Sequence, residues 1–480
     1  FEAPVVHQIY LEFDHKLKGG RSYALSFAGK AFPTLRFRHD PFTRRSESVH
    51  VSHLGFHPDD PVKRGYLSMW LGNGGRHRLE TLSTFHVVDV DAKRTVIKEL
   101  ISPAKSATQR NEDAYARNYN GTDVYSFDFT GLDQPGTYRI YVEGIGCSYP
   151  FTIGATVWRD AFIVAARGLY HQRSGIAIGS PFTTYERPRG FHPDDGLRVY
   201  QSGCPLMDSA NGLNRLGTDR DNFGNLLRQA TTQIVANAWG GYFDAGDWDR
   251  RIQHLDATRL LLELCDLFPE VMLDVDLNIP ESENALPDLI DEALWNIDFF
   301  RRLQIPEGGI RGGIESAEHP RVGEGSWQES LPVMAYAPGV WSSYIYAGVA
   351  SRAAGVLRKA RLAEANTYHE SALRAMIWAE KELVKLTGSR LPHAVNDARN
   401  LAAVELFDLS GAQQWHDIFI RTTVFTKKDS ELAEPKRHDQ RDAAFVYCRT
   451  RQSAIDPAVR RNARLALIRE ANGSVAISES

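Results

Sequence analysis

The chain has 480 residues, with 56 basic and 60 acidic side chains and a formal net charge of −4. Apolar residues make up 42% and charged residues 24%, which is typical of a globular protein with a substantial core. This balanced charge, without a long basic run, argues against a nucleic acid partner. The four cysteines form no Cys-x-x-Cys pair, so we expect buried free thiols at Cys147, Cys204, Cys265 and Cys448.

Neither the start of the chain nor its longest uncharged run indicates a membrane segment. The chain starts at Phe1 without a charged and apolar leader, so we expect a mature form or a fragment. Residues 330–351 are uncharged and long enough to span a bilayer. They contain Pro332, Pro338 and Gly339, which would interrupt a membrane helix. We therefore predict a buried helix over this run and no membrane span.

Up to about residue 154 the apolar residues alternate with the period of a β-strand. Two runs place alternate residues on one face, namely Tyr125, Phe127, Phe129 and Tyr138, Ile140, Val142. Short strands separated by Pro/Gly turns predict an antiparallel sandwich over residues 49–154. Residues 1–48 hold two further runs, which are either extra strands or the remnant of an upstream β domain: Tyr10, Leu11, Phe13 and Tyr23, Leu25, Phe27.

From residue 155 onwards the apolar period is helical. The pattern between residues 286 and 303 covers several turns, and Pro287 suits a first helical turn. Further helices are predicted at residues 255–268, 365–386 and 401–409, the last with Gly411 as its C-cap. Because these helices follow one another with no strand pattern between them, we predict an all-α domain over residues 155–480.

The most informative motif is Gly-Gly-Tyr-Phe-Asp-Ala-Gly-Asp at residues 240–247. Asp244 and Asp247 lie three residues apart across a tight turn that Gly246 permits. Two carboxylates that converge on one point can activate a water molecule, because one accepts its proton while the other holds it in line. The alternatives are an Asp-rich turn in which Asp247 caps the next helix, or a calcium-binding loop.

The motif and its surroundings resemble glycoside hydrolase family 9, the inverting cellulase-type family, whose members carry a Gly-Gly-aromatic-x-Asp-Ala-Gly-Asp block. The similarity spans at least residues 51–420 and includes Leu-Pro-Asp-Leu-Ile-Asp-Glu-Ala at 286–293 and Leu-Ala-Ala-Val-Glu-Leu-Phe at 401–407. Residues 51–56 resemble the opening strand of the immunoglobulin-like domain that precedes many family 9 catalytic domains. The resemblance implies an N-terminal all-β immunoglobulin-like sandwich followed by an all-α (α/α)6 toroid.

The resemblance implies roles for individual residues. Asp247 would be the general base and Asp244 would co-orient the water, in an enzyme that hydrolyses β-linked glucans such as cellulose or cello-oligosaccharides with inversion. Trp248, Tyr242 and Trp327 are expected to stack on sugar rings, with core packing as the alternative for each. Two other functions stay open: an exo-acting β-glucosidase or β-glucosaminidase of the same family, and a non-catalytic carbohydrate-binding protein.

The general acid of the family is a glutamate in a C-terminal Asn-Glu-x-x-x-x-x-Asn motif, which has no counterpart near the end of this sequence. We therefore expect the catalytic domain at 155–480 to lack its C-terminal part. The next candidates for the proton donor are the glutamates of residues 307–329 and Glu405. As partner and location, the resemblance implies a carbohydrate substrate and a secreted or periplasmic protein.

Metal binding is the point at which the sequence departs from some relatives. These relatives bind zinc through Cys and His near a Tyr-x-Gln-Arg-Cys-Gly segment. This chain has Ser174 in place of that cysteine, and Phe191 precedes His192 where a Cys-His pair is often found. A zinc site needs about four converging nitrogen or sulfur ligands. We therefore expect no zinc and no required cofactor, while a structural calcium stays open.

Overall fold

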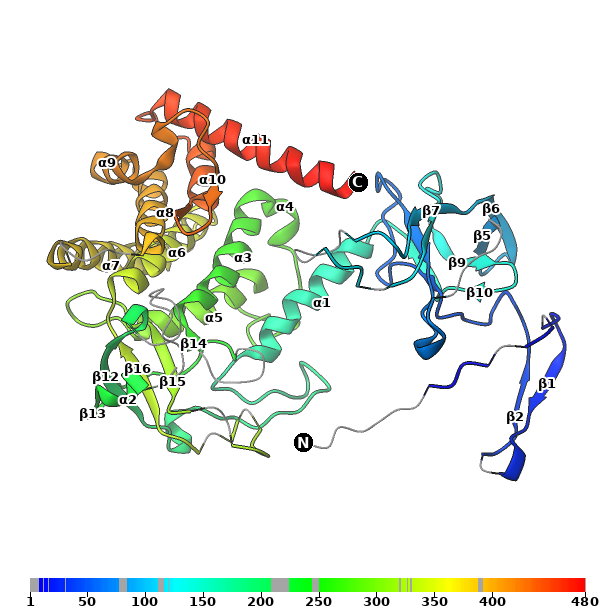
Figure 1. The fold of residues 1–480 in the computed structure, drawn as a ribbon. Helices are drawn as coiled ribbons and strands as arrows, with labels where there is room; N and C mark the ends of the chain where they lie inside the picture. Colours follow the sequence, from blue (N-terminus) through cyan, green and yellow to red (C-terminus); the bar gives the residue numbers. More distant parts are fainter. Residues whose placement is uncertain are drawn as a thin grey trace. The chain divides into compact units, whose positions relative to one another are not determined.

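The computed structural model describes residues 8–479 except 12, 16, 31, 77–83, 111–115, 120, 209–223, 244–249, 319–320, 326, 329 and 387–391. The chain divides into two compact units, Phe1–Val164 and Ala165–Ser480 (Figure 1). Helix α1 (Val157–Gln172) crosses the division between them.

The first unit is built from antiparallel sheets. One has the strand order β10-β9-β5-β6, with β11 also paired to β9, and another has the order β3-β4-β8-β7. Phe85, Phe127 and Ile140, which come from both sheets, are 0% exposed in one shared core. This arrangement confirms the predicted sandwich. The strands are β3 Val49–His50, β4 Arg64–Leu67, β5 Thr84–Asp89, β6 Arg94–Leu100, β7 Ser102–Lys105, β8 Val124–Asp128, β9 Gly136–Val142, β10 Gly146–Cys147 and β11 Phe151–Ile153.

A separate hairpin precedes the sandwich. It pairs β1 (Ser22–Leu25) with β2 (Leu35–Arg38), and the ring of Tyr23 stacks on that of Phe37 with centroids 5.7 Å apart. Of the two alternating runs in this part of the chain, the one at Tyr23 and Leu25 is therefore an extra strand. The described residues of the other run, which includes Tyr10, lie outside any strand.

The second unit is mainly helical, as predicted. Helix α6 packs against α3, α7 and α8, and α8 packs against α9 and α10. At the crossing of α6 and α8 a Cβ on Gly348 would lie 3.4 Å from the Cα of Ala402, so these two small residues let the helices approach closely. The helices are α2 Gly224–Arg228, α3 Leu255–Leu267, α4 Pro269–Met272, α5 Asp288–Arg302, α6 Val340–Lys359, α7 Ala365–Lys385, α8 His393–Ser410, α9 Gln413–Thr422, α10 Arg441–Arg449 and α11 Pro457–Glu479.

Helix α8 begins earlier than the apolar pattern indicated. It starts at His393 rather than at residue 401, and it ends as predicted at Gly411, whose φ is +66°. The first two turns contain few apolar residues and are stabilised by polar contacts instead. Asn396 donates to the carbonyl of Thr422 at 3.1 Å, and Asn400 donates to that of Phe419 at 3.1 Å. Such polar packing leaves no apolar periodicity in the sequence.

The helical unit also contains a sheet that the sequence did not predict. Its strands run in the order β13-β12-β16-β15-β14, with β12 and β16 parallel. Strand β16 occupies the first half of the uncharged run at 330–351, so the expected single buried helix is wrong there, and α6 begins only after Pro338-Gly339. A short apolar run fits a buried strand as well as a buried helix. The strands are β12 Val199–Pro205, β13 Ala230–Ile234, β14 Arg250–Arg251, β15 Gly313–Ser316 and β16 Val333–Ala337; β17 Ala433–Glu434 and β18 His438–Asp439 form a small separate hairpin.

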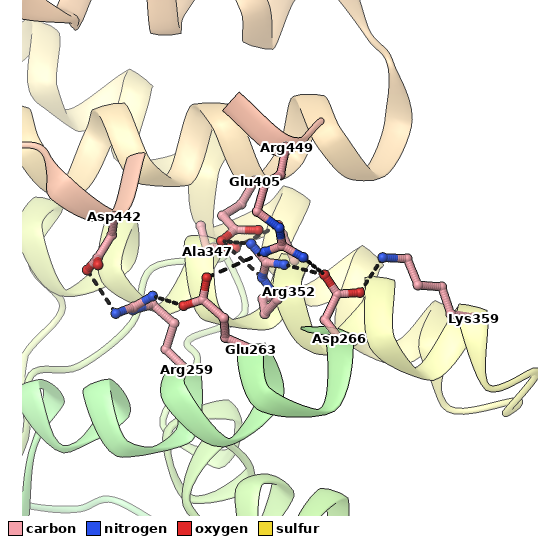
Figure 2. Close-up of polar contacts among 10 residues, drawn as sticks. Arg259, Glu263, Asp266, Ala347, Arg352, Lys359, Glu405, Asp442 and Arg449 are labelled. Atoms are coloured by element: carbon pink, nitrogen blue, oxygen red, sulfur yellow. Dashed lines mark hydrogen bonds and ion pairs between the residues drawn. The ribbon is translucent and has the colours of Figure 1, made fainter. Parts of the chain in front are cut away.

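A network of ion pairs joins four helices of this unit, and we call it the helix-linking cluster (Figure 2). The side chain of Asp266 on α3 is 4% exposed and accepts from Arg352 of α6 at 3.1 Å and from Arg449 of α10 at 3.0 Å. Arg352 also pairs with Glu405 of α8 at 2.8 Å, and Lys359 of α6 contacts Asp266.

Across the part of the chain that the structure describes, no helix is long and apolar enough to cross a membrane.

Candidate active site

The Asp-containing motif lies between two segments that the structure describes. Asp244, Asp247 and Trp248 themselves fall within residues 244–249 and are outside the described residues. The segment before them is 240–243, and the segment after them is β14. The geometry of these two flanks shows how the chain enters and leaves the motif.

The upstream flank lies against helix α5 and the end of α1. Gly240 and Gly241 have φ values of +98° and +73°, and a Cβ on Gly241 would lie 2.9 Å from the ring of Phe299. Both positions therefore need glycine. The carbonyl of Gly241 accepts from the backbone N–H of Ser174 at 2.9 Å and from the indole of Trp295 at 3.0 Å. The N–H of Phe243 donates to the carbonyl of Gln172 at 2.8 Å.

Tyr242 points into the interior from this flank. Its side chain is 4% exposed, and its hydroxyl donates to Glu292 of α5, at 2.7 Å to the carboxylate and 2.9 Å to the main-chain carbonyl. Burial, followed by the neighbouring charge of Glu292, raises the pKa of Tyr242 well above its usual range. This placement favours core packing, which was the alternative for Tyr242, while its contact with sugar stays a prediction.

Behind Tyr242 lies a second set of buried charges, which we call the motif-side cluster: Arg173, Glu281 and Glu292. Arg173 is 0% exposed and contacts Glu281 at 2.9 Å and Glu292 at 3.1 Å. Its guanidinium also lies 4.6 Å from the centre of the Trp295 ring. Glu292 is 0% exposed, and burial raises its pKa although Arg173 opposes this change.

Asp291 adds another carboxylate beside Glu292. It is 9% exposed and accepts from the side chain of Asn284 at 3.2 Å. Burial raises the pKa of Asp291 to about 6; the Asn284 hydrogen bond opposes this shift, and the nearby charge of Glu281 adds to it. Around this part of α5, the carboxylates of Glu281, Asp291 and Glu292 thus lie near the single guanidinium of Arg173.

The downstream flank is fixed by the sheet of the second unit. Strand β14 pairs with β15, so that Arg251 lies opposite Gly313, and the N–H of Ile252 donates to the carbonyl of Gly312 at 2.9 Å. The side chain of Arg251 pairs with Glu315 at 2.7 Å, and Glu315 is 3% exposed. Both ends of the Asp-containing segment are thus held by hydrogen bonds to regular secondary structure.

Packing contacts connect Trp327 with the upstream flank. Gly190 lies against the backbone of Trp327, since a Cβ on Gly190 would approach its carbonyl oxygen to 2.6 Å. The next residue, Phe191, packs edge-on against Phe243 with ring centroids 5.8 Å apart. Trp327 keeps 37% of its surface exposed, and its contact with sugar rings stays a prediction.

The segments compared with zinc-binding relatives have other contacts in this chain. Ser174 is 0% exposed and its N–H donates to Gly241, while His192 packs edge-on against Trp239 with centroids 4.5 Å apart. Outside the gaps in the described sequence, no group of three or more His, Cys, Asp or Glu side chains is placed to hold a metal ion. The expectations for zinc and calcium stay predictions.

Sequence reasoning did not identify the motif-side cluster. Arg173 and Glu292 are 119 positions apart. The available signal was that Glu292 lies in the block at 286–293 and Arg173 in the Tyr-His-Gln-Arg segment, both of which carry the family resemblance. That signal marks both segments as part of the family resemblance. It does not reveal that the side chains of Arg173 and Glu292 pair.

Comparisons with known proteins agree with this architecture. Residues 44–147 match the family described as cellulase N-terminal ig-like domain. The chain is 29% identical over 189 residues to Endoglucanase D of Acetivibrio thermocellus, a match that covers 39% of this chain and 26% of that protein. It is 26% identical over 185 residues to a xyloglucan-specific endo-beta-1,4-glucanase of Bacteroides ovatus, covering 38% of this chain and 27% of that protein. The matches thus span about a quarter of the length of these relatives.

Solved structures share the fold over most of the chain. A metagenome-derived glycoside hydrolase family 9 endoglucanase superposes with a TM-score of 0.66 at 24% identity, covering 88% of this chain and 72% of that one. A Bacteroides ovatus GH9 structure gives 0.68 at 19% identity, covering 89% and 73%. The fold is therefore an immunoglobulin-like domain followed by a mainly helical domain, as in these structures. The resemblance to family 9 is confirmed, and the chain has the domain order and fold of its cellulase-type members.

Proposed function

We propose that the chain is the immunoglobulin-like and catalytic part of an inverting glycoside hydrolase that acts on β-linked glucans such as cellulose or cello-oligosaccharides. In this proposal Asp247 is the general base and Asp244 co-orients the attacking water. Trp248 and Trp327 contact the sugar rings, and the reaction requires no cofactor. The relatives named above support a carbohydrate substrate, and they favour a secreted or periplasmic location.

One observation carries this proposal. The segment that holds both aspartates begins and ends at fixed points, one against α1 and α5 and the other on β14. A catalytic base must be held close to one geometry, because misplacement by about 1 Å can reduce a rate about a hundred-fold. A solvated Asp-rich turn would need no such support on both sides.

The chemistry follows from two carboxylates three residues apart. In an inverting glycosidase the base removes a proton from water, which attacks the sugar from the face opposite the leaving group. The carboxyl groups of base and acid lie about 6.5–9.5 Å apart, which leaves room for this water. Two carboxylates so close in sequence repel each other when both are ionised, which raises the pKa of one of them. A base with a raised pKa accepts a proton more readily in the transition state.

The test is the substitution Asp247→Asn in the full chain. We expect kcat on an activated glycosyl fluoride to fall by several orders of magnitude while KM changes little, because the amide cannot accept the proton. Asp244→Asn is expected to be nearly as severe. Asp417→Asn, an exposed position on α9, is the matched control and should leave kcat unchanged. Near-normal turnover by Asp247→Asn would refute the assignment.

The products decide between this function and its two alternatives. The anomeric form of the first product, followed by NMR, shows whether the configuration is inverted. Release of monosaccharide alone from a cello-oligosaccharide ladder would favour an exo-acting β-glucosidase or β-glucosaminidase. Saturable glycan binding without release of reducing ends, and without release of fluoride from the activated substrate, would favour a non-catalytic carbohydrate-binding protein.

A further inference from the structure

We propose that Tyr242 is a positioning residue, whose hydrogen bond to the buried Glu292 holds the main chain that carries Asp244 and Asp247. The inference rests on the proposed function and adds a residue to it. It also differs from the sequence prediction, in which Tyr242 contacts the sugar directly.

The first step is the short covalent path from Tyr242 to the motif. Asp244 is two residues further along the chain, and two residues span at most roughly 7 Å. A displacement of Tyr242 has therefore only a short stretch of main chain to cross before it reaches Asp244. The main chain of this flank is also held at Gly241, by the Trp295 indole of α5 and the N–H of Ser174, and at Phe243 by the carbonyl of Gln172. To these contacts the Tyr242 hydroxyl adds a side-chain hydrogen bond to α5.

The second step is the charge at the far end of the hydrogen bond. Arg173 is shared between two glutamates, so its single positive charge faces two negative ones. The side chain of Glu281 is 31% exposed and is solvated, whereas Glu292 is 0% exposed. The Tyr242 hydroxyl therefore supplies Glu292 with a second donor besides Arg173. Hydrogen bonds to a buried carboxylate are short and strong, so this bond is suited to fixing a position.

The third step concerns cost. A buried arginine–carboxylate pair often stabilises a fold no better than apolar side chains of the same volume would, because both charges must leave water. A gain in the free energy of unfolding is therefore a poor explanation for the presence of the motif-side cluster. Holding Tyr242 in one place is a better explanation. A hydrogen bond to a fixed carboxylate sets the direction and distance of the Tyr242 hydroxyl, which apolar packing does not.

The chain provides its own matched control. Tyr344 of α6 is 0% exposed, and its hydroxyl donates to Glu380 of α7 at 2.7 Å, the same distance as in the Tyr242–Glu292 bond. Glu380 also pairs with an arginine, Arg399 of α8, at 2.6 Å. Both tyrosines thus belong to a Tyr–Glu–Arg set, and only one of these sets holds the chain that leads into the motif.

The experiment compares Tyr242→Phe with Tyr344→Phe in the full chain, with an activated glycosyl fluoride as substrate. Each variant removes the hydroxyl donor of one glutamate. Both should lower Tm, and Tyr242→Phe should lower it more, because Glu292 is buried whereas the side chain of Glu380 is 26% exposed. Tyr242→Phe should lower kcat by about ten- to a hundred-fold with KM within about two-fold, because the base is displaced while sugar binding is not. Tyr344→Phe should leave both constants within about two-fold of wild type.

Two results would overturn the proposal while leaving the proposed function intact. One is an equal kcat in both variants, with wild type active and Asp247→Asn inactive. The other is a raised KM with unchanged kcat in Tyr242→Phe, which would make Tyr242 a sugar contact. If wild type and Asp247→Asn hydrolyse the substrate equally well, the proposed function fails and this inference fails with it.

A second variant keeps the test decisive if Tyr242→Phe does not fold. Glu292→Gln retains an oxygen that accepts from the Tyr242 hydroxyl and removes the negative charge that faces Arg173. We expect a lower Tm and a kcat within about three-fold of wild type, because the hydrogen bond persists. A loss of kcat beyond ten-fold in this folded variant would contradict the claim that the hydrogen bond holds the motif.

Discussion

The helix-linking cluster and the motif-side cluster use the same chemistry with different connections. In the helix-linking cluster, Arg352 pairs with Asp266 and Glu405, and all three residues lie on helices (Figure 2). In the motif-side cluster, Glu292 pairs with Arg173 and accepts from Tyr242. The first cluster joins helix to helix, whereas the second joins a helix to the chain entering the motif. The role of a buried ion pair therefore depends on the elements it connects.

The two clusters also differ in charge balance. Asp266 has three cations around it, and although burial raises its pKa, Lys359, Arg352 and Arg449 together lower it. Burial raises the pKa of Glu405 to about 7, against the effect of Arg352. Glu405 is 3% exposed and lies between helices, so this position does not favour it as a proton donor to a substrate. In the motif-side cluster the two glutamates outnumber the one arginine, Arg173. The pKa of the neighbouring Asp291 is raised.

The largest expected effect on stability comes from breaking the helix-linking cluster. Arg352→Ala leaves Glu405 buried without its arginine, and we expect the free energy of unfolding to fall by about 3–5 kcal/mol. Urea denaturation followed by circular dichroism measures this change. Lys359→Ala removes a cation whose side chain is 67% exposed, and it should cost less than about 1 kcal/mol. Equal losses in the two variants would show that Arg352 is not the centre of the cluster.

Asp291 provides a pH test of the motif-side region. Its folded pKa of about 6 lies above the usual value near 4, so the folded state binds the proton more tightly. The resulting stabilisation is fully present below about pH 4 and is lost as the pH rises through about 6. Asp291→Asn stays neutral, so we expect it to be more stable than wild type by about 3 kcal/mol at pH 7. At pH 4 the two proteins should unfold at the same urea concentration; a constant difference across this range would contradict the raised pKa.

The smallest expected effect on stability distinguishes the clusters most clearly. Replacing both partners of a buried pair by apolar side chains is often nearly neutral. We expect Arg352→Met/Glu405→Leu to unfold within about 1 kcal/mol of wild type and to keep its kcat. Arg173→Met/Glu292→Leu should be similarly stable and should lose about ten-fold in kcat, because Tyr242 no longer has its carboxylate acceptor. The same kcat in both double variants would mean that the clusters do not differ in function.

The sequence alone determined the domain order and several of its elements. Alternation at Tyr138, Ile140 and Val142 predicted strand β9, and the helical period after Pro287 predicted α5. The block at residues 240–247, together with the blocks at 286–293 and 401–407, indicated the family resemblance. The predictions of strand and helix succeed because side-chain periodicity depends on neighbours within one strand or helix.

Only the tertiary structure decided which side chains meet. The sheet formed by β12 to β16 was missed, because its pairs connect distant and short segments whose apolar residues fit a helix as well. From the sequence, Tyr242 is an aromatic residue beside the Asp-containing motif, yet the fold places its hydroxyl 2.7 Å from Glu292, fifty positions away. Arg173 and Glu292 pair because α1 and α5 bring them together, and a contact of this kind depends on how whole elements pack rather than on any local pattern.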